Sequence, residues 1–268
     1  MVYLCRMYEW WYFPLLFGGG LLAGIINTLA GNGSAITLSI LMLSGMPANV
    51  ANGTNRIGAL VQTVTAILSL RRSPRTVYLF KDSLWFLIPA IIGSLIGALL
   101  AVDVDPQILK RIIGFIMLLL LGTMLYKPAK WAKATDLSQS RRKPLNWLLL
   151  FFVAVYGGFL QMGIGIMMLS ILVLLAHYSL RDANIIKLTL AVLFVIPAFI
   201  VFLISGNLEW IPGLALAAGQ GIGAVIGARY ILFLPKANTI VRYTLIVILS
   251  ISSFTLLGLF EWISGLWT

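Results

Sequence analysis

Long apolar runs constrain this chain more than any other feature of its sequence. A helix that crosses the hydrocarbon core of a membrane needs about 20 mostly apolar residues. With 60% apolar and only 10% charged residues, the chain has too few polar groups to cover a soluble domain, in which about 25% of residues are charged. The runs show no β-barrel alternation, and helices satisfy their own backbone in lipid. We therefore predict an all-α polytopic membrane protein, with apolar stretches near 13–45, 56–70, 84–102, 109–126, 146–177, 186–205, 210–228 and 240–259.

Two of these stretches, 13–45 and 146–177, are too long for a single membrane-spanning helix. Each carries glycines near its middle, Gly31-Asn32-Gly33 in the first and Gly163-Ile164-Gly165 in the second. Glycine weakens a helix and permits a turn. We predict that each stretch consists of two short helices that meet at a break inside the membrane. The alternative is that these glycines only allow close helix packing.

The chain also repeats itself around a polar linker. In each half the glycine-rich segment is followed by an Ala-Asn step, at Ala51-Asn52 and Ala183-Asn184, and then by a Gly-x-x-x-Gly-Ala motif. Such duplication is typical of transporters built from inverted repeats. We predict two homologous repeats in inverted orientation, each with one broken or re-entrant segment and three spanning helices. The expected divisions are 1–126 for the first transmembrane repeat, 127–145 for the linker and 146–268 for the second repeat.

The charges predict how the chain is oriented. Its net charge is +11, and the linker 127–145 is rich in Lys and Arg. Basic loops favour the cytoplasmic side, so we expect a multipass protein of the cell membrane with a cytoplasmic linker and both termini outside. This arrangement requires the stretch 146–177 to turn back on itself. A docking role for the linker is the less favoured alternative, and we expect no nucleic acid partner.

Nothing in the sequence indicates catalysis or a bound cofactor. One His and one Cys cannot form the usual His/Cys zinc site, and no phosphate-binding Gly-x-x-x-x-Gly-Lys-Ser/Thr loop is present. We therefore expect neither an enzyme nor a metal site. A coupling ion, either a proton or sodium, is left open.

Motifs in both halves resemble one known family. They are AGIINTLAGNGS at 23–34, GMP at 45–47 and ANGTN at 51–55 in the first half. In the second half they are YGGFLQMGIGIMML at 156–169, DAN at 182–184 and Lys187. Together they resemble the two repeats of the sulfite exporter TauE/SafE family. The resemblance implies a multipass transporter of anions such as sulfite and organosulfonates, although Asn32, Ser39, Met167 and Met168 depart from the family's usual pattern.

A transported anion loses water near the membrane centre, and the free N–H groups of helix N-termini can replace that water. We therefore expect the substrate site at the two breaks, with amide side chains beside them. Two cations, Arg56 and Lys187, follow the Ala-Asn steps and suit an anionic partner. The candidate substrate-binding residues are Asn27, Gly31, Asn32, Gly33, Asn52, Thr54, Asn55, Arg56, Gln161, Gly163, Gly165, Asn184 and Lys187.

Each of these assignments has an alternative. The alternative for the amides is interhelical hydrogen bonding, and the alternative for both cations is extension to the membrane interface. The function that we favour is secondary transport of small anions, chiefly sulfur oxyanions or organosulfonates, by alternating access at a midplane site. The alternatives are a passive anion channel and a non-catalytic membrane subunit of a larger complex. The expected partners are the substrate and the lipid bilayer, and a homo-oligomer is left open.

Overall fold

The structure is a computed structural model that describes residues 10–29, 31–70, 74–125, 144–229 and 237–258. These residues form helices and no strand, as predicted, and most of the predicted linker lies outside them. A 3₁₀ turn (Leu84–Phe86) and a π-helical turn (Ile171–Leu175) extend two of the helices. The α-helices are α2 (Tyr12–Leu29), α3 (Ser34–Leu43), α4 (Ala48–Leu70), α5 (Pro74–Ser83), α6 (Leu87–Asp103), α7 (Pro106–Leu125), α8 (Pro144–Leu160), α9 (Ile164–Ser170), α10 (Leu180–Ile204), α11 (Trp210–Arg229) and α12 (Ala237–Leu256).

Among the described residues, 4 helical spans are long and apolar enough to cross a membrane. They are Tyr12–Leu29, Arg75–Asp103, Asp182–Ile204 and Trp210–Arg229. Large apolar side chains also cover the outside of the bundle, among them Ile88 on α6 and Leu214 on α11. In water such a surface would be an extended apolar patch. The chain is therefore a membrane-embedded protein.

Several helix starts follow from local sequence. Proline is the first residue of α5, α7 and α8, a position where its missing N–H and fixed φ cost nothing. The carboxylate of Asp105 caps α7 by accepting from the N–H of Gln107 at 2.9 Å. The predicted boundaries were wrong at α4 and α10, which begin at Ala48 and Leu180, so both Ala-Asn steps lie inside helices. Helix α5 falls between two of the predicted apolar stretches, 56–70 and 84–102.

Both long apolar stretches are broken helices, as predicted. The first is interrupted between α2 and α3, and the second between α8 and α9. Gly31 and Gly163 adopt φ values of +77° and +74° at the breaks. This left-handed conformation is strained for residues that carry a Cβ atom, which explains why glycine stands at each break.

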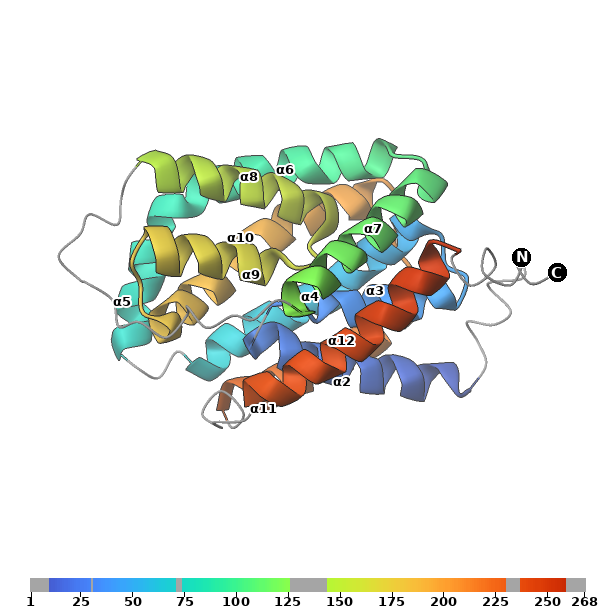
Figure 1. Cartoon of the computed structure of the whole chain (residues 1–268). Helices are drawn as coiled ribbons and strands as arrows, with labels where there is room; N and C mark the ends of the chain where they lie inside the picture. Colours follow the sequence, from blue (N-terminus) through green and yellow to red (C-terminus); the bar gives the residue numbers. More distant parts are fainter. Residues whose placement is uncertain (1–9, 30, 71–73, 126–143, 230–236, 259–268) are drawn as a thin grey trace.

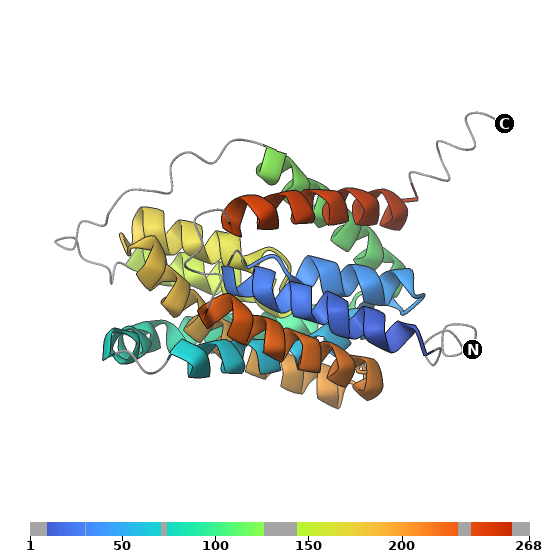
Figure 2. The ribbon, with the colours of Figure 1, turned by 90° about the horizontal axis from the view of Figure 1, so that it is seen from below.

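The two broken segments are helical hairpins. The hydroxyl groups of Tyr12, the first residue of α2, and Ser44, just after α3, are 2.9 Å apart. The chain therefore returns to the level at which it entered. In the second hairpin, α9 and the π-helical turn pack back against α8. Figure 1 shows α2 running from right to left and α8 running from left to right, and Figure 2 shows the same course for α2 from below.

The two halves of the chain interleave. Helix α11 of the second half packs on α2 and α4 of the first, while α6 of the first half packs on α8 and α10 of the second. Both crossings are close because glycines face main-chain carbonyls. A Cβ atom on Gly219 would meet the carbonyl of Phe17, and one on Gly93 would meet that of Phe151. Such small-residue contacts let backbones approach in membranes, and here they pack each hairpin against the other half.

Candidate functional site

The breaks of the two hairpins meet in the interior of the bundle. A Cβ atom on Gly31 would collide with the Cα atom of Gly165, and one on Gly165 would collide with Gly31. Both residues are buried. The structure therefore brings together the two sites of helix interruption that lie far apart in the sequence.

Asn27 holds the first break in place. Its side-chain oxygen accepts from the N–H of Gly33 at 2.6 Å, and its side-chain nitrogen donates to Gln62 of α4 at 2.8 Å. The same nitrogen lies 3.5 Å from the hydroxyl of Ser34. One amide thus links the end of α2, the start of α3 and the middle of α4. Asn27 satisfies one of the free N–H groups at the start of α3.

Helix α4 presents a polar stripe to both hairpins. Asn52, Asn55, Arg56 and Gln62 recur at helical spacing on one side of α4, and all four are buried. Asn55 accepts from the hydroxyl of Thr37 on α3 at 2.5 Å. The stripe therefore contacts the first hairpin through Asn55 and Gln62, and the second hairpin through the other two residues.

Arg56 binds the end of α8. Its guanidinium donates to the carbonyls of Gly157 and Gly158, both at 2.7 Å, and lies 3.4 Å from Asn52. Asn52 donates in turn to the carbonyl of Phe159 at 2.7 Å. Arg56 is 0% exposed, so the alternative in which it extends to the membrane interface is wrong. The last carbonyls of a helix carry partial negative charge, and Arg56 neutralises it.

Lys187 binds the end of α2 in the same manner. Its ammonium lies 3.2 Å from the carbonyl of Thr28 and 3.4 Å from that of Asn27. It also donates to the side-chain oxygen of Asn184 at 2.8 Å. Lys187 is 2% exposed, so it too does not extend to the interface. Arg56 and Lys187 both stand at the breaks, and each contacts main-chain carbonyls.

Several buried polar atoms beside the breaks have no hydrogen-bond partner within the described structure. They include both polar atoms of the Asn32 side chain, the side-chain nitrogen of Asn55, the Nε of Arg56 and the side-chain oxygen of Gln161. Buried polar groups are normally paired. Three of these atoms are N–H donors, which suit the oxygens of an anion. A polar ligand that binds beside the breaks would therefore supply the hydrogen bonds that these atoms lack.

Carboxylates are scarce near these donors. Asp182 is the one buried carboxylate among the described residues, and its Oδ2 lies 2.6 Å from the guanidinium of Arg75. No group of three or more His, Cys, Asp or Glu residues lies together in that part of the chain. The surroundings of the breaks therefore favour an anion over a cation.

Not every predicted residue lies at the breaks. Thr54 is buried, but it accepts from the N–H of Glu209 ahead of α11 at 2.9 Å. Gly163 does lie at the second break, where it faces Leu120 of α7. The hydroxyls of Thr63 and Thr65, further along α4, donate to carbonyls of their own helix.

The residues that sequence reasoning missed are Thr37 and the carbonyls of Gly157 and Gly158. A hydroxyl within an apolar run was the only signal for Thr37. A carbonyl acceptor leaves no mark in a sequence, although the end of α8 before a break necessarily carries free carbonyls.

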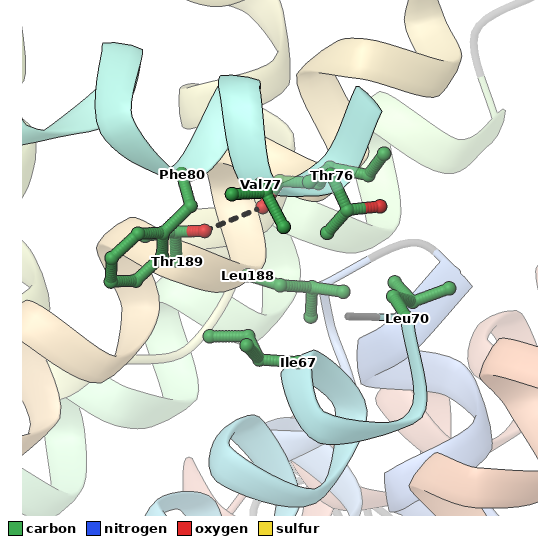
Figure 3. Close-up of a pocket in the computed structure, with 8 residues that line it drawn as sticks. Ile67, Leu70, Thr76, Val77, Phe80, Leu188 and Thr189 are labelled. Carbon is green, nitrogen blue, oxygen red and sulfur yellow. Dashed lines mark hydrogen bonds between the residues drawn. The ribbon is translucent and has the colours of Figure 1, made fainter. Parts of the chain in front are cut away.

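A cavity of about 220 Å³ lies between α4, α5 and α10, toward the end of α4 (Figure 3). The hydroxyl of Thr189 is turned back onto the carbonyl of Ile185 at 3.1 Å, so the walls are almost wholly apolar. This cavity does not match the charge of an anion, and we do not assign it as the substrate site. Its lining residues are Ile67, Leu70, Thr76, Val77, Phe80, Ile185, Leu188 and Thr189.

Two broken hairpins that meet inside a bundle of apolar helices are typical of one class of protein, the membrane transporters with discontinuous helices. The sequence profile of the sulfite exporter TauE/SafE family matches residues 16–256. The chain belongs to this family and is a membrane transporter.

Relatives support this assignment. A probable membrane transporter protein of Haemophilus influenzae is 31% identical over 241 residues, covering 88% of this chain and 90% of the relative. The probable membrane transporter protein ORF9 of a Sinorhizobium species is also 31% identical, covering 87% of each chain. The probable membrane transporter protein YfcA of Escherichia coli K12 is 28% identical, covering 91% of this chain and 88% of the relative. No solved structure matches the chain significantly.

Proposed function

We propose that the chain is a secondary transporter of small anions, with sulfur oxyanions or organosulfonates as its substrates. The observation that carries this proposal is the meeting of the two breaks at Gly31 and Gly165, with unpaired buried N–H groups beside them. Irregular backbone is tolerated at membrane depth where it lines a cavity. Family membership supports the sulfur chemistry, since the family is described by its sulfite exporters.

The proposed site combines the amides of the first break with the polar stripe of α4. Asn27 and Asn32 lie at the first break, Asn55 and Arg56 on α4, and Gln161 at the second break. The donors are the side-chain nitrogens of Asn32 and Asn55 and the Nε of Arg56, each of which is buried and unpaired among the described residues. Asn52, Asn184 and Lys187 position the site, because they fix the helix ends that form it.

In this proposal alternating access arises by rocking one half against the other. The opposite courses of α2 and α8 in Figure 1 support an inverted relation of the two halves. With the basic linker in the cytoplasm, both termini face the outside of the cell membrane. The linker, which joins the two halves at 127–145, acts mainly as the anchor of this orientation.

Ligand binding tests the substrate class. Purified protein is heated in detergent with sulfite, thiosulfate, methanesulfonate or acetate, each at a concentration series. A ligand that binds the folded state raises its apparent stability by mass action. We expect stabilisation by at least one sulfur anion and less by acetate. Stabilisation by none of the three sulfur anions would contradict the proposal.

A further inference from the structure

Lys187 and Arg56 both stabilise the end of a broken helix, but their side chains differ in chemistry. Each donates to the final carbonyls of the first helix of a hairpin. A guanidinium stays charged in proteins, whereas a buried lysine can release its proton. The contacts of the first hairpin with Lys187 can therefore be switched by a proton, while those of the second hairpin with Arg56 cannot.

From this asymmetry we propose that Lys187 is the proton-binding group that couples anion transport to a proton gradient. The proposal rests on the anion transport proposed above and adds the coupling ion. Protonated Lys187 holds the end of α2 and contributes positive charge at the first break. On release, the N–H bond of the ammonium breaks, the electron pair stays on Nζ and the proton passes to water. Anion and proton therefore bind together and move in the same direction.

Asn27 connects Lys187 to the proposed anion site. Its main-chain carbonyl lies 3.4 Å from the Lys187 ammonium, while its side-chain oxygen holds the N–H of Gly33 at 2.6 Å. A change at Lys187 thus acts on the residue that positions the start of α3. The positive charge of protonated Lys187 favours anion binding at the first break. Because the coupling between two ligands is reciprocal, a bound anion must favour the protonated lysine.

No carboxylate pairs with Lys187 among the described residues, where its partners are two main-chain carbonyls and Asn184. Helix α10 packs against α2, α4, α5, α6, α8, α9 and the π-helical turn. The charged groups of these elements are engaged elsewhere or lie at their ends: Arg56 on α8 carbonyls, Arg75 on Asp182 and Asp82 on Tyr178. The other titratable groups on them are Tyr12, Tyr78, Lys81, Asp103 and Tyr156.

Proton uptake on anion binding tests the proposal. Purified full-length protein in weakly buffered detergent solution, with a pH indicator, is titrated with thiosulfate or methanesulfonate. These anions do not titrate near neutral pH, so any uptake belongs to the protein. We expect wild-type protein to take up as much as about one proton per bound anion. Lys187→Arg should bind anion, detected by thermal stabilisation, without proton uptake.

Two further variants complete the test. Lys81→Arg makes the same replacement at an exposed residue of α5, and proton uptake should be unchanged. Asn184→Asp keeps the oxygen that lies 2.8 Å from the ammonium but adds a charge that retains the proton. Its uptake should move to higher pH. This variant tests the proposal even if Lys187→Arg does not fold.

The outcomes separate the two proposals. Anion binding by wild-type protein without proton uptake across the physiological range of about pH 5 to 8 would overturn the role of Lys187. So would undiminished uptake by Lys187→Arg, or an unmoved pH profile of Asn184→Asp. Failure of wild-type protein to bind either of these anions or sulfite would instead overturn the proposed transport function, together with the coupling that rests on it.

Discussion

Arg56 of α4 and Lys187 of α10 each bind the end of a helix that belongs to the opposite half of the chain. Arg56 donates to α8 carbonyls at 2.7 Å, and Lys187 lies 3.2 Å from an α2 carbonyl. A helix that stops inside a membrane leaves carbonyls that lipid cannot satisfy. Arg56 donates to such carbonyls at the end of α8, and Lys187 does so at the end of α2. Each half of the chain therefore stabilises the broken helix of the other.

Replacing Arg56 by Ala should destabilise the protein strongly. The change leaves the carbonyls of Gly157 and Gly158 without their charged donor. Each buried carbonyl that loses its donor costs about 1–3 kcal/mol, and this change leaves two of them unsatisfied. The melting temperature of the variant in detergent should therefore be clearly lower than that of wild-type protein.

Asn52→Ala is the matched control for Arg56, because it removes one uncharged donor from the neighbouring Phe159 carbonyl. Its cost should be smaller, about 1–3 kcal/mol. Equal melting temperatures for wild-type protein and Arg56→Ala would show that the guanidinium does not stabilise α8.

Replacing Gly31 by Ala should disrupt the contact between the hairpins. The new methyl group would collide with Gly165, and Gly31 has a φ of +77°. The left-handed conformation alone costs roughly 1–2 kcal/mol for a residue with a Cβ atom. Gly18→Ala is the control, because nothing lies within 4 Å of the added methyl group there. Thermal unfolding should distinguish the two variants, and equal stability would argue against a tight contact.

Replacing Asn27 by Asp should weaken anion binding more than folding. The carboxylate can still accept from the N–H of Gly33, but its negative charge repels an anion at the first break. We expect the Kd for a sulfur anion to rise at least about tenfold, which corresponds to 1.4 kcal/mol.

The control for Asn27→Asp is Asn207→Asp, which keeps the oxygen that accepts from Asn49 at 3.0 Å outside the breaks. Titration by thermal shift should give this control the affinity of wild-type protein. An Asn27→Asp variant that binds anions normally would place the substrate elsewhere.

The ion pair between Arg75 and Asp182 should matter little, despite its short distance of 2.6 Å. The side chain of Arg75 is 51% exposed, and water screens exposed pairs, which are typically worth 0–1 kcal/mol. The melting temperature of Asp182→Asn should therefore differ only slightly from that of wild-type protein. Adding salt should not widen this difference. A large loss of stability would mean that α5 is held on α10 mainly by this pair.

The helices and both breaks could be predicted because apolar length and glycine position are visible in the sequence. A run such as 13–45 exceeds one membrane crossing, and Gly31 marks where it must turn. The starts of α4 and α10 were missed, because their first two turns include polar residues, among them Asn52 and Asp182, that are buried against other helices. Burial of that kind depends on partners far away in the sequence.

The candidate residues could be named from the sequence, but their partners could not. Arg56 and Lys187 stood out as cations in apolar helices, and the expected partner was an anion. In the structure their donors bind main-chain carbonyls of the opposite half. Carbonyls are the same in every residue, so only the three-dimensional arrangement of α8 and α2 identifies which of them are free.

Counterflow in proteoliposomes tests the transport account most directly. Vesicles containing the purified protein are loaded with unlabelled thiosulfate, diluted into a trace of labelled thiosulfate and compared with unloaded vesicles. Alternating access predicts saturable uptake that is faster into the loaded vesicles, and a loss of this uptake in Asn27→Asp. Uptake that does not saturate and ignores internal thiosulfate, or no uptake of any sulfur anion, would contradict a carrier with its site between the two breaks.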